Sequence, residues 1–342
     1  MKECTISDIA KKAGVGKATV SRVINKSGYV KEETREKIVQ AMEELNFIPS
    51  ATARNLSFRQ SNAIGIVFPE ITTPFGIGIL KGVGRVIEKN NLVMIVCNTD
   101  VTPEGDIVAL KQLREQRVCG LLFVSAVEYG DDEKSRYVKS LLSSLSAPVV
   151  LVDRYIPGTD FDGVYSENLA GAYAATEALI HAGHKRIGSA VGNLGLHIGR
   201  SRLLGFKQAL EDNGLEFNED YCIFGRGEMQ QTYEKAKAFL QNKDLPTAMF
   251  ASNDLSGKGL LRAIHEKGLR VPDEMAFIGF DPIDGYIYGK EYSCLNRDAA
   301  ELGEKAAEIL MKRLKEELPE EPKVLHLSSD LCLVGTERYT KG

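Results

Sequence analysis

From residue 63 onward, short apolar runs alternate with amphipathic segments, and this alternation is the feature that most limits the possible folds. The apolar runs lie at 64–68, 92–97, 120–124, 149–152, 186–191, 248–251 and 276–280. Segments with helical spacing lie between them, at 75–90, 104–117, 169–182, 200–213, 230–241 and 255–268. Runs this short, flanked by helical segments, predict buried parallel strands in βαβ units. Units repeating about every 30 residues predict two doubly wound α/β lobes.

The first 62 residues have a different pattern, which divides the chain into three parts. The pattern of residues 1–47 predicts short helices, and residues 48–62 form a polar stretch long enough for one or two helical turns. Residues 63–342 form the α/β body. At 342 residues the chain is also too long for one ordinary domain.

Charge is unevenly distributed between these parts. Residues 1–60 hold seven Lys and four Arg against seven Asp and Glu, a net charge of +4, and the whole-chain charge of −4 then leaves −8 for the rest. A basic head on an acidic body predicts that only the head contacts phosphate. We expect a cytoplasmic protein without a membrane partner, because no apolar signal or spanning segment is visible. The six cysteines are scattered without a C-x-x-C pair, which predicts reduced thiols and no metal site.

The head has the pattern of a helix-turn-helix. Thr5 is placed to cap a first helix with Asp8 closing a capping box, and Gly14 can make the turn that follows. In the second helix Val20, Val23 and Ile24 face inward. The outward face then holds Lys17, Ala18, Ser21 and Arg22, a short basic surface suited to the major groove. A third helix is expected at 32–45. Such a pattern alone can also be merely structural.

The amino-acid sequences of the head, the linker and the body closely resemble those of the LacI/GalR family of transcription regulators. The resemblance lies in Thr5-Ile6-x-Asp8-Ile9-Ala10, Ala18-Thr19-Val20-Ser21-Arg22-Val23-Ile24-Asn25, Ile48-Pro49-Ser50-Ala51, Ile64-Gly65-Ile66-Val67-Phe68-Pro69, Gly183-His184-Lys185-Arg186-Ile187, Asn253-Asp254 and Gly279-Phe280-Asp281. It therefore runs through nearly the whole chain. It implies a regulator, not an enzyme, that works without a cofactor.

The resemblance implies a set of DNA-binding residues in the head and linker. Lys17, Ala18 and Arg22 match base-edge readers. The full expected set is Thr5, Lys17, Ala18, Thr19, Ser21, Arg22, Asn25, Tyr29, Thr34, Ala53 and Leu56. Residues 50–57 resemble a hinge helix that folds on the operator, and Leu56 matches a leucine that wedges into the minor groove and bends the duplex. The alternative for Leu56 is an ordinary linker leucine.

For the body the resemblance implies a periplasmic-binding-protein-like fold with an effector between the lobes. The chain should cross between lobes near Phe161, Tyr292 and Lys323, so that lobe 1 holds 63–161 and 293–323, and lobe 2 holds 162–292 and 324–342. Ligands of open α/β sheets bind beyond the carboxyl ends of strands. The expected effector residues are Thr73, Phe75, Ser125, Asp153, Arg202, Asn253 and Asp281. Asp153 could instead be a structural partner of Arg154.

The expected effector is a small molecule, most simply a carbohydrate, because Asp, Asn and Arg side chains suit vicinal hydroxyls. Thr73, Glu167 and the segment around Arg226 depart from the family pattern. Arg154 and Arg226 leave an anionic sugar derivative open. The expected macromolecular partners are a second copy of the chain and double-stranded, pseudo-palindromic operator DNA, whose symmetry mirrors a homodimer.

An enzyme is the main rival reading, since doubly wound sheets often bind nucleotides. Gly76, Gly78 and Gly82 do not have the G-x-G-x-x-G spacing, and no P-loop, G-x-S-x-G or H-E-x-x-H is present. A secreted sugar-binding protein would share the body but not the DNA-reading head. The sequence therefore favours a DNA-binding repressor switched by a small effector.

Overall fold

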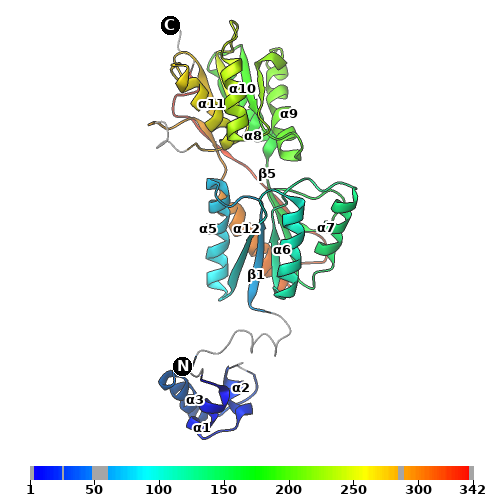
Figure 1. Cartoon of the computed structure of the whole chain (residues 1–342), viewed down its shortest axis with the longest axis vertical. Coiled ribbons are helices and arrows are strands. Elements are labelled where there is room, and N and C mark those ends of the chain that lie inside the picture. Colours follow the sequence, from blue (N-terminus) through cyan, green and yellow to red (C-terminus); the bar gives the residue numbers. More distant parts are fainter. Residues whose placement is uncertain (1–3, 25–26, 48–60, 284–288, 339–342) are drawn as a thin grey trace.

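The computed structural model of the chain describes residues 4–24, 27–47, 61–283 and 289–338. Within these ranges it contains a helical head and a body of two α/β lobes (Figure 1). The predicted hinge helix lies outside the described residues, as do Asn25, Ala53 and Leu56.

The head is built from α1 (Ile6–Ala13), α2 (Lys17–Ile24) and α3 (Glu32–Glu44). The predicted capping box is confirmed, because the Thr5 backbone N–H donates to Asp8 Oδ2 at 2.9 Å. Gly14 ends α1 with φ 68°, the left-handed conformation that the turn needs. Ile9, Val20 and Ile38, one from each helix, form the fully buried centre of the head core.

The first lobe is a six-stranded parallel sheet covered by helices on both faces. Its strands are β1 (Ala63–Phe68), β2 (Val93–Asn98), β3 (Gly120–Phe123), β4 (Val149–Val152), β5 (Asp162–Ser166) and β11 (Val324–Leu327), in the order β11-β5-β4-β3-β1-β2. The helices α5 (Pro74–Lys89) and α12 (Ala299–Leu314) pack on one face, and α6 (Pro103–Glu115) and α7 (Glu133–Ser143) on the other (Figure 1). Gly82 allows α5 to approach α12, since a Cβ there would lie 1.9 Å from the Ala300 carbonyl oxygen.

The second lobe repeats this architecture. Its strands are β6 (Ile187–Val191), β7 (Cys222–Phe224), β8 (Ala248–Ala251), β9 (Ala276–Gly279), β10 (Cys294–Asn296) and β12 (Asp330–Cys332), in the order β12-β10-β9-β8-β6-β7. The pairs are parallel except that β12 runs antiparallel to β10. The helices are α8 (Asn168–His181) and α9 (His197–Asp212) on one face and α10 (Met229–Phe239) and α11 (Asp254–Glu266) on the other, with the short 3-10 helix η1 (Glu219–Tyr221) before β7. The predicted two-lobed, doubly wound body is confirmed.

The chain crosses between lobes at three places, each later in the sequence than predicted. Because β5 belongs to the first sheet, the first crossing follows Ser166 and not Phe161. Likewise β10 belongs to the second sheet and β11 to the first, so the other crossings follow Asn296 and Leu327. These short strands mix polar with apolar residues, and each continues its sheet up to the crossover.

The buried His184 predicts a pH dependence of stability. Its Nδ1 lies 2.9 Å from Thr247 Oγ1 and its Nε2 lies 3.2 Å from the Glu337 carbonyl oxygen. Burial lowers the pKa of His184 below the ordinary value of 6.5. A lowered pKa means that the unfolded chain binds the proton more readily, so this contribution to stability is present above pH 6.5 and lost as the pH falls.

We expect the free energy of unfolding, from urea titration, to fall between about pH 7 and pH 5.5, and to fall less in His184→Gln. The matched control is His265→Gln at an exposed histidine of α11, which should keep the wild-type pH dependence. An identical pH dependence in all three proteins would mean that other groups cause it.

Candidate DNA interface and effector cleft

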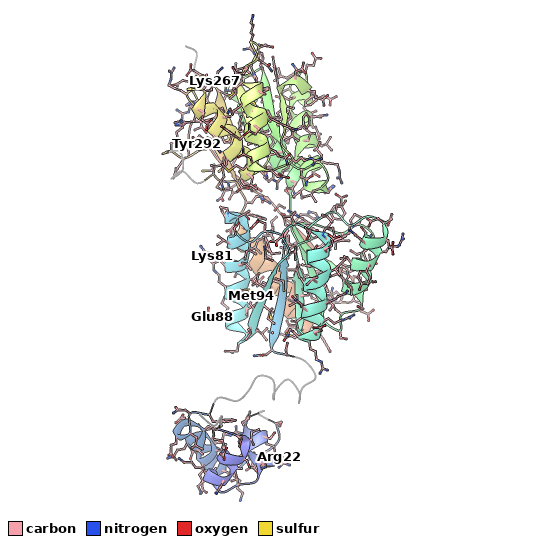
Figure 2. The ribbon with its side chains drawn as sticks, viewed as in Figure 1. Arg22, Lys81, Glu88, Met94, Lys267 and Tyr292 are labelled. Carbon is pink, nitrogen blue, oxygen red and sulfur yellow. The ribbon has the colours of Figure 1, made fainter. Side chains whose placement is uncertain are left out.

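The outer face of α2 presents a short basic surface. Val20 and Val23 are buried in the head core, whereas Lys17, Ala18 and Arg22 are exposed. Figure 2 shows Arg22 on the head. A guanidinium can donate two parallel hydrogen bonds to a guanine edge, and a small neighbour such as Ala18 lets the helix approach the groove. This face has the chemistry of a recognition helix.

The other described head residues of the predicted DNA set differ in their exposure. Tyr29 is 86% exposed, whereas Thr19, Ser21 and Thr34 are half-buried. Thr5 is exposed at the start of α1, but its hydroxyl donates to Asp8 Oδ2 at 2.6 Å. Thr5 therefore stabilises the helix start, and its part in DNA binding stays a prediction, as does that of the rest of the set.

A cleft of about 390 Å³ opens between the two lobes. Its lining follows the carboxyl ends of strands in both sheets, where open α/β sheets bind ligands. The structure brings six of the seven predicted effector residues together in this lining: Thr73, Phe75, Asp153, Arg202, Asn253 and Asp281.

Arg297, which the sequence analysis did not select, lies at the centre of the charged lining. Its Nη1 is 3.1 Å from Asp153 Oδ1 in the first lobe, and its Nε and Nη2 are 2.9 and 2.6 Å from Asp281 Oδ1 in the second. The guanidinium also lies over the Phe75 ring, 3.8 Å from its centroid. One buried side chain at a crossover thus holds a carboxylate from each lobe.

Arg202 approaches the same carboxylate from α9. It is 4% exposed; its Nε donates to Asn168 Oδ1 at 2.8 Å and its Nη1 to the Ser252 carbonyl at 2.6 Å. Its Nη1 also lies 3.7 Å from Asp281 Oδ2, and its guanidinium stacks 3.6 Å above the Phe280 ring centroid. Asp281 therefore lies between two arginines.

The two arginines differ in how well the protein neutralises them. Burial lowers the pKa of Arg202 to about 9, and the like charge of Arg297 acts in the same direction. Burial also opposes the charge of Arg297, but the carboxylates of Asp281 and Asp153 outweigh it and raise the pKa of Arg297. The protein therefore neutralises the charge of Arg202 less well than that of Arg297, and oxygen atoms of a ligand would stabilise the Arg202 guanidinium.

Two of the predicted effector residues also cap helices. Thr73 Oγ1 accepts from the Gly76 N–H at the start of α5, at 3.1 Å. Asn253 Oδ1 accepts from the Ser256 N–H at 3.1 Å, so Asn253 is the N-cap of α11. The Asn253 amide group also donates to the Gly227 carbonyl at 3.0 Å. Both side chains line the cleft with much of their hydrogen-bonding capacity already used.

Ser125 does not line the main cleft, contrary to the prediction. It is fully buried and borders a small neighbouring pocket, whereas Val124 faces the cleft. Side chains alternate in direction at the end of a strand, so the residue after Val124 points away from it. The neighbouring Arg154 holds this loop, because its Nη1 donates to the carbonyls of Ser125 and Ala126 at 2.7 and 3.0 Å.

The charges around the cleft are nearly balanced, which bears on the anionic alternative. The Nη1 of Arg154 already donates to two backbone carbonyls, and the side chain of Arg226 is exposed to solvent. The charged lining consists of Arg154, Arg202, Arg226, Arg297, Glu70, Asp153, Glu228, Asp254 and Asp281. An uncharged ligand with many hydroxyl groups suits such a lining better than a strongly anionic one.

The described part of the chain offers no group of three or more His, Cys, Asp or Glu that could hold a metal ion. In the same residues, no helix is both long enough and apolar enough to span a bilayer.

Comparison with known proteins agrees with both halves of the structure. Residues 5–50 match the model of bacterial regulatory proteins of the lacI family, and residues 176–333 match a periplasmic binding protein-like domain. The chain is 36% identical over 312 residues to the HTH-type transcriptional repressor PurR of Haemophilus influenzae strain PittEE, covering 91% of each protein. It is 33% identical over 316 residues to the ribose operon repressor of H. influenzae strain KW20, covering 91% of this chain and 92% of the relative.

Solved structures give the same picture. The lac repressor dimer bound to operator and the anti-inducer ONPF matches with a TM-score of 0.85 at 26% identity, covering 98% of this chain and all of that one. A complex of the regulator CelR with cellobiose matches with a TM-score of 0.71 at 28% identity, covering 97% and 99%. With its helix-turn-helix head and its two-lobed body, the chain belongs to the LacI family and is a DNA-binding transcriptional repressor.

Proposed function

We propose that a carbohydrate or a sugar derivative, bound in the cleft between the lobes, switches the affinity of this repressor for its operator. The observation that carries the proposal is the charged lining, in which Asp153, Asp281, Arg202 and Arg297 converge beside Phe75. Carboxylates accept from vicinal hydroxyls, guanidiniums donate to them, and an aromatic ring covers the apolar face of a sugar. The names of two similar proteins, a ribose operon repressor and a cellobiose complex, support the carbohydrate class.

The switch follows from the position of Arg297 between the lobes. A ligand hydroxyl that binds Asp153 or Asp281 competes with Arg297 for that carboxylate and so changes the link between the lobes. Such a ligand shifts the arrangement of the lobes by as much as its affinity differs between the two arrangements. The arrangement of the lobes in turn sets the spacing of the two heads on DNA.

A thermal-shift screen of the purified full-length chain tests this proposal. The panel holds neutral sugars, sugar acids, sugar phosphates and purines. A ligand at 100 times its Kd adds about 2.7 kcal/mol to the stability of the folded state, so the expected rise in Tm is several degrees. Hits confined to sugars would support the proposal. Hits confined to purines, or no hit, would contradict the carbohydrate class while leaving DNA binding intact.

Arg202→Ala is expected to abolish the effector response. The change removes the partner of Asn168 and one of the two cations at Asp281, and with them the donor we expect the ligand to use. Titration of the identified effector should show a loss of at least about 100-fold in affinity, as when a buried charged partner is removed. Operator affinity without effector should change little.

The control for Arg202 is Lys207→Ala in the same helix, which lies over Phe217 away from the cleft. It should bind effector like the wild type. Normal induction of the Arg202→Ala protein would refute the assignment of Arg202 to the ligand.

We further propose a homodimer that joins through the face formed by α5 and β2. The strand β2 is the edge of the first sheet, and Val93 and Val96 on it are 53% and 37% exposed, with Ile77 of α5 at 44%. Figure 2 shows Lys81 of α5 and Met94 of β2 on the same side of the body in this view. An apolar, unpaired sheet edge of this kind is suited to pairing with a second copy.

Val93→Glu is expected to weaken the dimer, because it places a charge in the proposed apolar interface. Sedimentation equilibrium should show a Kd for dimerisation at least about tenfold higher than that of the wild type. The control is Val108→Glu on α6, where the valine is 52% exposed but lies on another element. Equal dimerisation of both variants would exclude this face.

Residues 1–47 form the DNA-binding head, 48–62 the hinge helix and linker, and 63–342 the effector-binding and dimerisation body. Two heads of the dimer read a pseudo-palindromic operator through the expected residues of α2, with Leu56 entering the minor groove. The protein acts in the cytoplasm, where its operator and effector meet.

A further inference from the structure

Two cysteines far apart in the sequence face each other in the second lobe. Cys294 of β10 and Cys332 of β12 are direct partners in the antiparallel register. Side chains of directly opposed residues leave a sheet on the same face. The scattered sequence positions predicted reduced thiols, and this pairing arises only from the fold.

The hydrogen bonds of β10 define the geometry of the pair. The Gly279 N–H donates to the Ser293 carbonyl at 2.9 Å, so Ser293 directs its carbonyl toward β9. Backbone groups alternate in direction along a strand, and Cys294 therefore directs its own amide and carbonyl toward β12. Opposed residues of this type have Cα atoms about 5.5 Å apart, inside the range of roughly 4.4–6.8 Å that a disulfide spans. Their Cβ atoms lie at the long end of the disulfide range, which makes such a bond easier to reduce.

The two thiols differ in accessibility. Cys294 is buried, and its burial, with the neighbouring Cys332, raises its pKa to about 12. Cys332 is exposed on β12. An oxidant in solution therefore meets Cys332 first, and Cys294 is placed behind it as the second thiol. Such a pair has the arrangement of a reactive cysteine beside a resolving cysteine.

We propose that Cys294 and Cys332 form a reversible disulfide when the protein meets hydrogen peroxide. The Cys332 sulfur attacks one peroxide oxygen, the O–O bond breaks, and a sulfenic acid and one water result. The Cys294 sulfur then attacks the Cys332 sulfur and displaces the second water. In total two thiols and one peroxide become one disulfide and two waters. Reduced glutathione reverses the reaction by thiol–disulfide exchange, since it can reach the exposed Cys332 sulfur.

The location of the pair gives the bond a consequence for the hinge. Cys294 lies just before the crossover that carries Arg297, and Cys332 lies just after the crossover that leads from β11 to β12. The disulfide ties two of the three crossovers together at their ends in the second lobe. Oxidation therefore restrains the movement of the lobes, a step that rests on the proposed effector switch.

Thiol counting and mass spectrometry on the full-length protein test the bond itself. After peroxide treatment and denaturation, the six cysteines of the reduced chain should fall to four titratable thiols. Peptide mapping should find Cys294 linked to Cys332 within one chain. Cys332→Ser and Cys294→Ser should each lose the bond, and Cys97→Ser, a half-buried cysteine of β2, should retain it. A persistent sulfinic acid on Cys332, a disulfide between two chains, or no thiol loss would each overturn the proposal.

Hydrogen exchange tests the consequence separately. Oxidised wild type should exchange the backbone amides of Arg297 and Ser329, in the two crossovers, at least about tenfold more slowly than reduced protein. The oxidised Cys332→Ser protein should exchange them at the reduced wild-type rate. A mapped disulfide with unchanged exchange would overturn the restraint on the hinge. Neither result depends on the identity of the effector, so failure here is distinguishable from failure of the carbohydrate proposal.

Discussion

Replacing Arg297 with Met is expected to lower the free energy of unfolding of the body by about 3–5 kcal/mol, the largest effect we expect from a single change in the cleft. The variant leaves Asp153 and Asp281 buried without their shared cation, although Arg202 remains near Asp281 at 3.7 Å. Removing one partner of a buried ion pair costs the uncompensated desolvation of the other. Urea unfolding monitored by circular dichroism measures the change.

Two further variants make this result specific. Arg270→Met removes an exposed arginine that pairs with Asp273 and Glu274, and it should cost less than about 0.5 kcal/mol. Asp281→Asn combined with Arg297→Met should cost less than the sum of the single changes, because the stranded carboxylate is gone. Additive single and double changes would show that Arg297 and Asp281 are independent, against the geometry described above.

Replacing Arg22 with Ala is expected to weaken operator binding by about 1–3 kcal/mol for each half-site, and twice that in the proposed dimer. The exposed Arg22 guanidinium on the outer face of α2 is placed to donate two hydrogen bonds to a guanine edge. The buried Val20 and Val23 on the opposite face keep the helix packed in the head. The fold of the head should be unaffected. Fluorescence anisotropy, with an operator selected from random duplexes by the wild-type chain, measures the loss.

The matched control in the head is Lys37→Gln. Lys37 is exposed on α3 and pairs with Glu33 at 2.7 Å, away from the predicted reading face. It should change operator affinity by less than about threefold. Arg22→Ala should also bind selected and random duplexes with nearly equal affinity. If it keeps the wild-type preference for the operator, Arg22 does not read the bases.

The regular elements of the body could be predicted wherever the chain repeats a local pattern. The strand at 64–68 is an unbroken apolar run because both faces of β1 are buried, and the helix at 255–268 agrees with α11 to within two residues at each end. The helices α7 and α12 were not predicted, and neither were the five short strands β5, β7, β10, β11 and β12. Three of these strands contain only three residues each, too few for a periodicity to develop.

Arg297 was not selected as an effector residue because β10, the strand directly before it, was not predicted. Asp153 follows β4 and Asp281 follows β9, two strands that the sequence predicted, but the strand before Arg297 was not predicted. The available signal was the group of apolar residues Tyr292, Cys294 and Leu295 just ahead of an arginine. Ser125 was misplaced for the opposite reason. The strand before it was predicted correctly, but its side chain points away from the cleft.

The sequence by itself determined the helix-turn-helix head, the alternation of strands and helices, and the family, because these depend on residues a few positions apart. The tertiary structure alone decided which distant side chains meet. Asp153 and Arg297 are separated by 144 positions, and Cys294 and Cys332 face each other only because β12 returns antiparallel to β10. Propensity and periodicity act along the chain, whereas ion pairs and thiol contacts depend on distances in space that only packing sets.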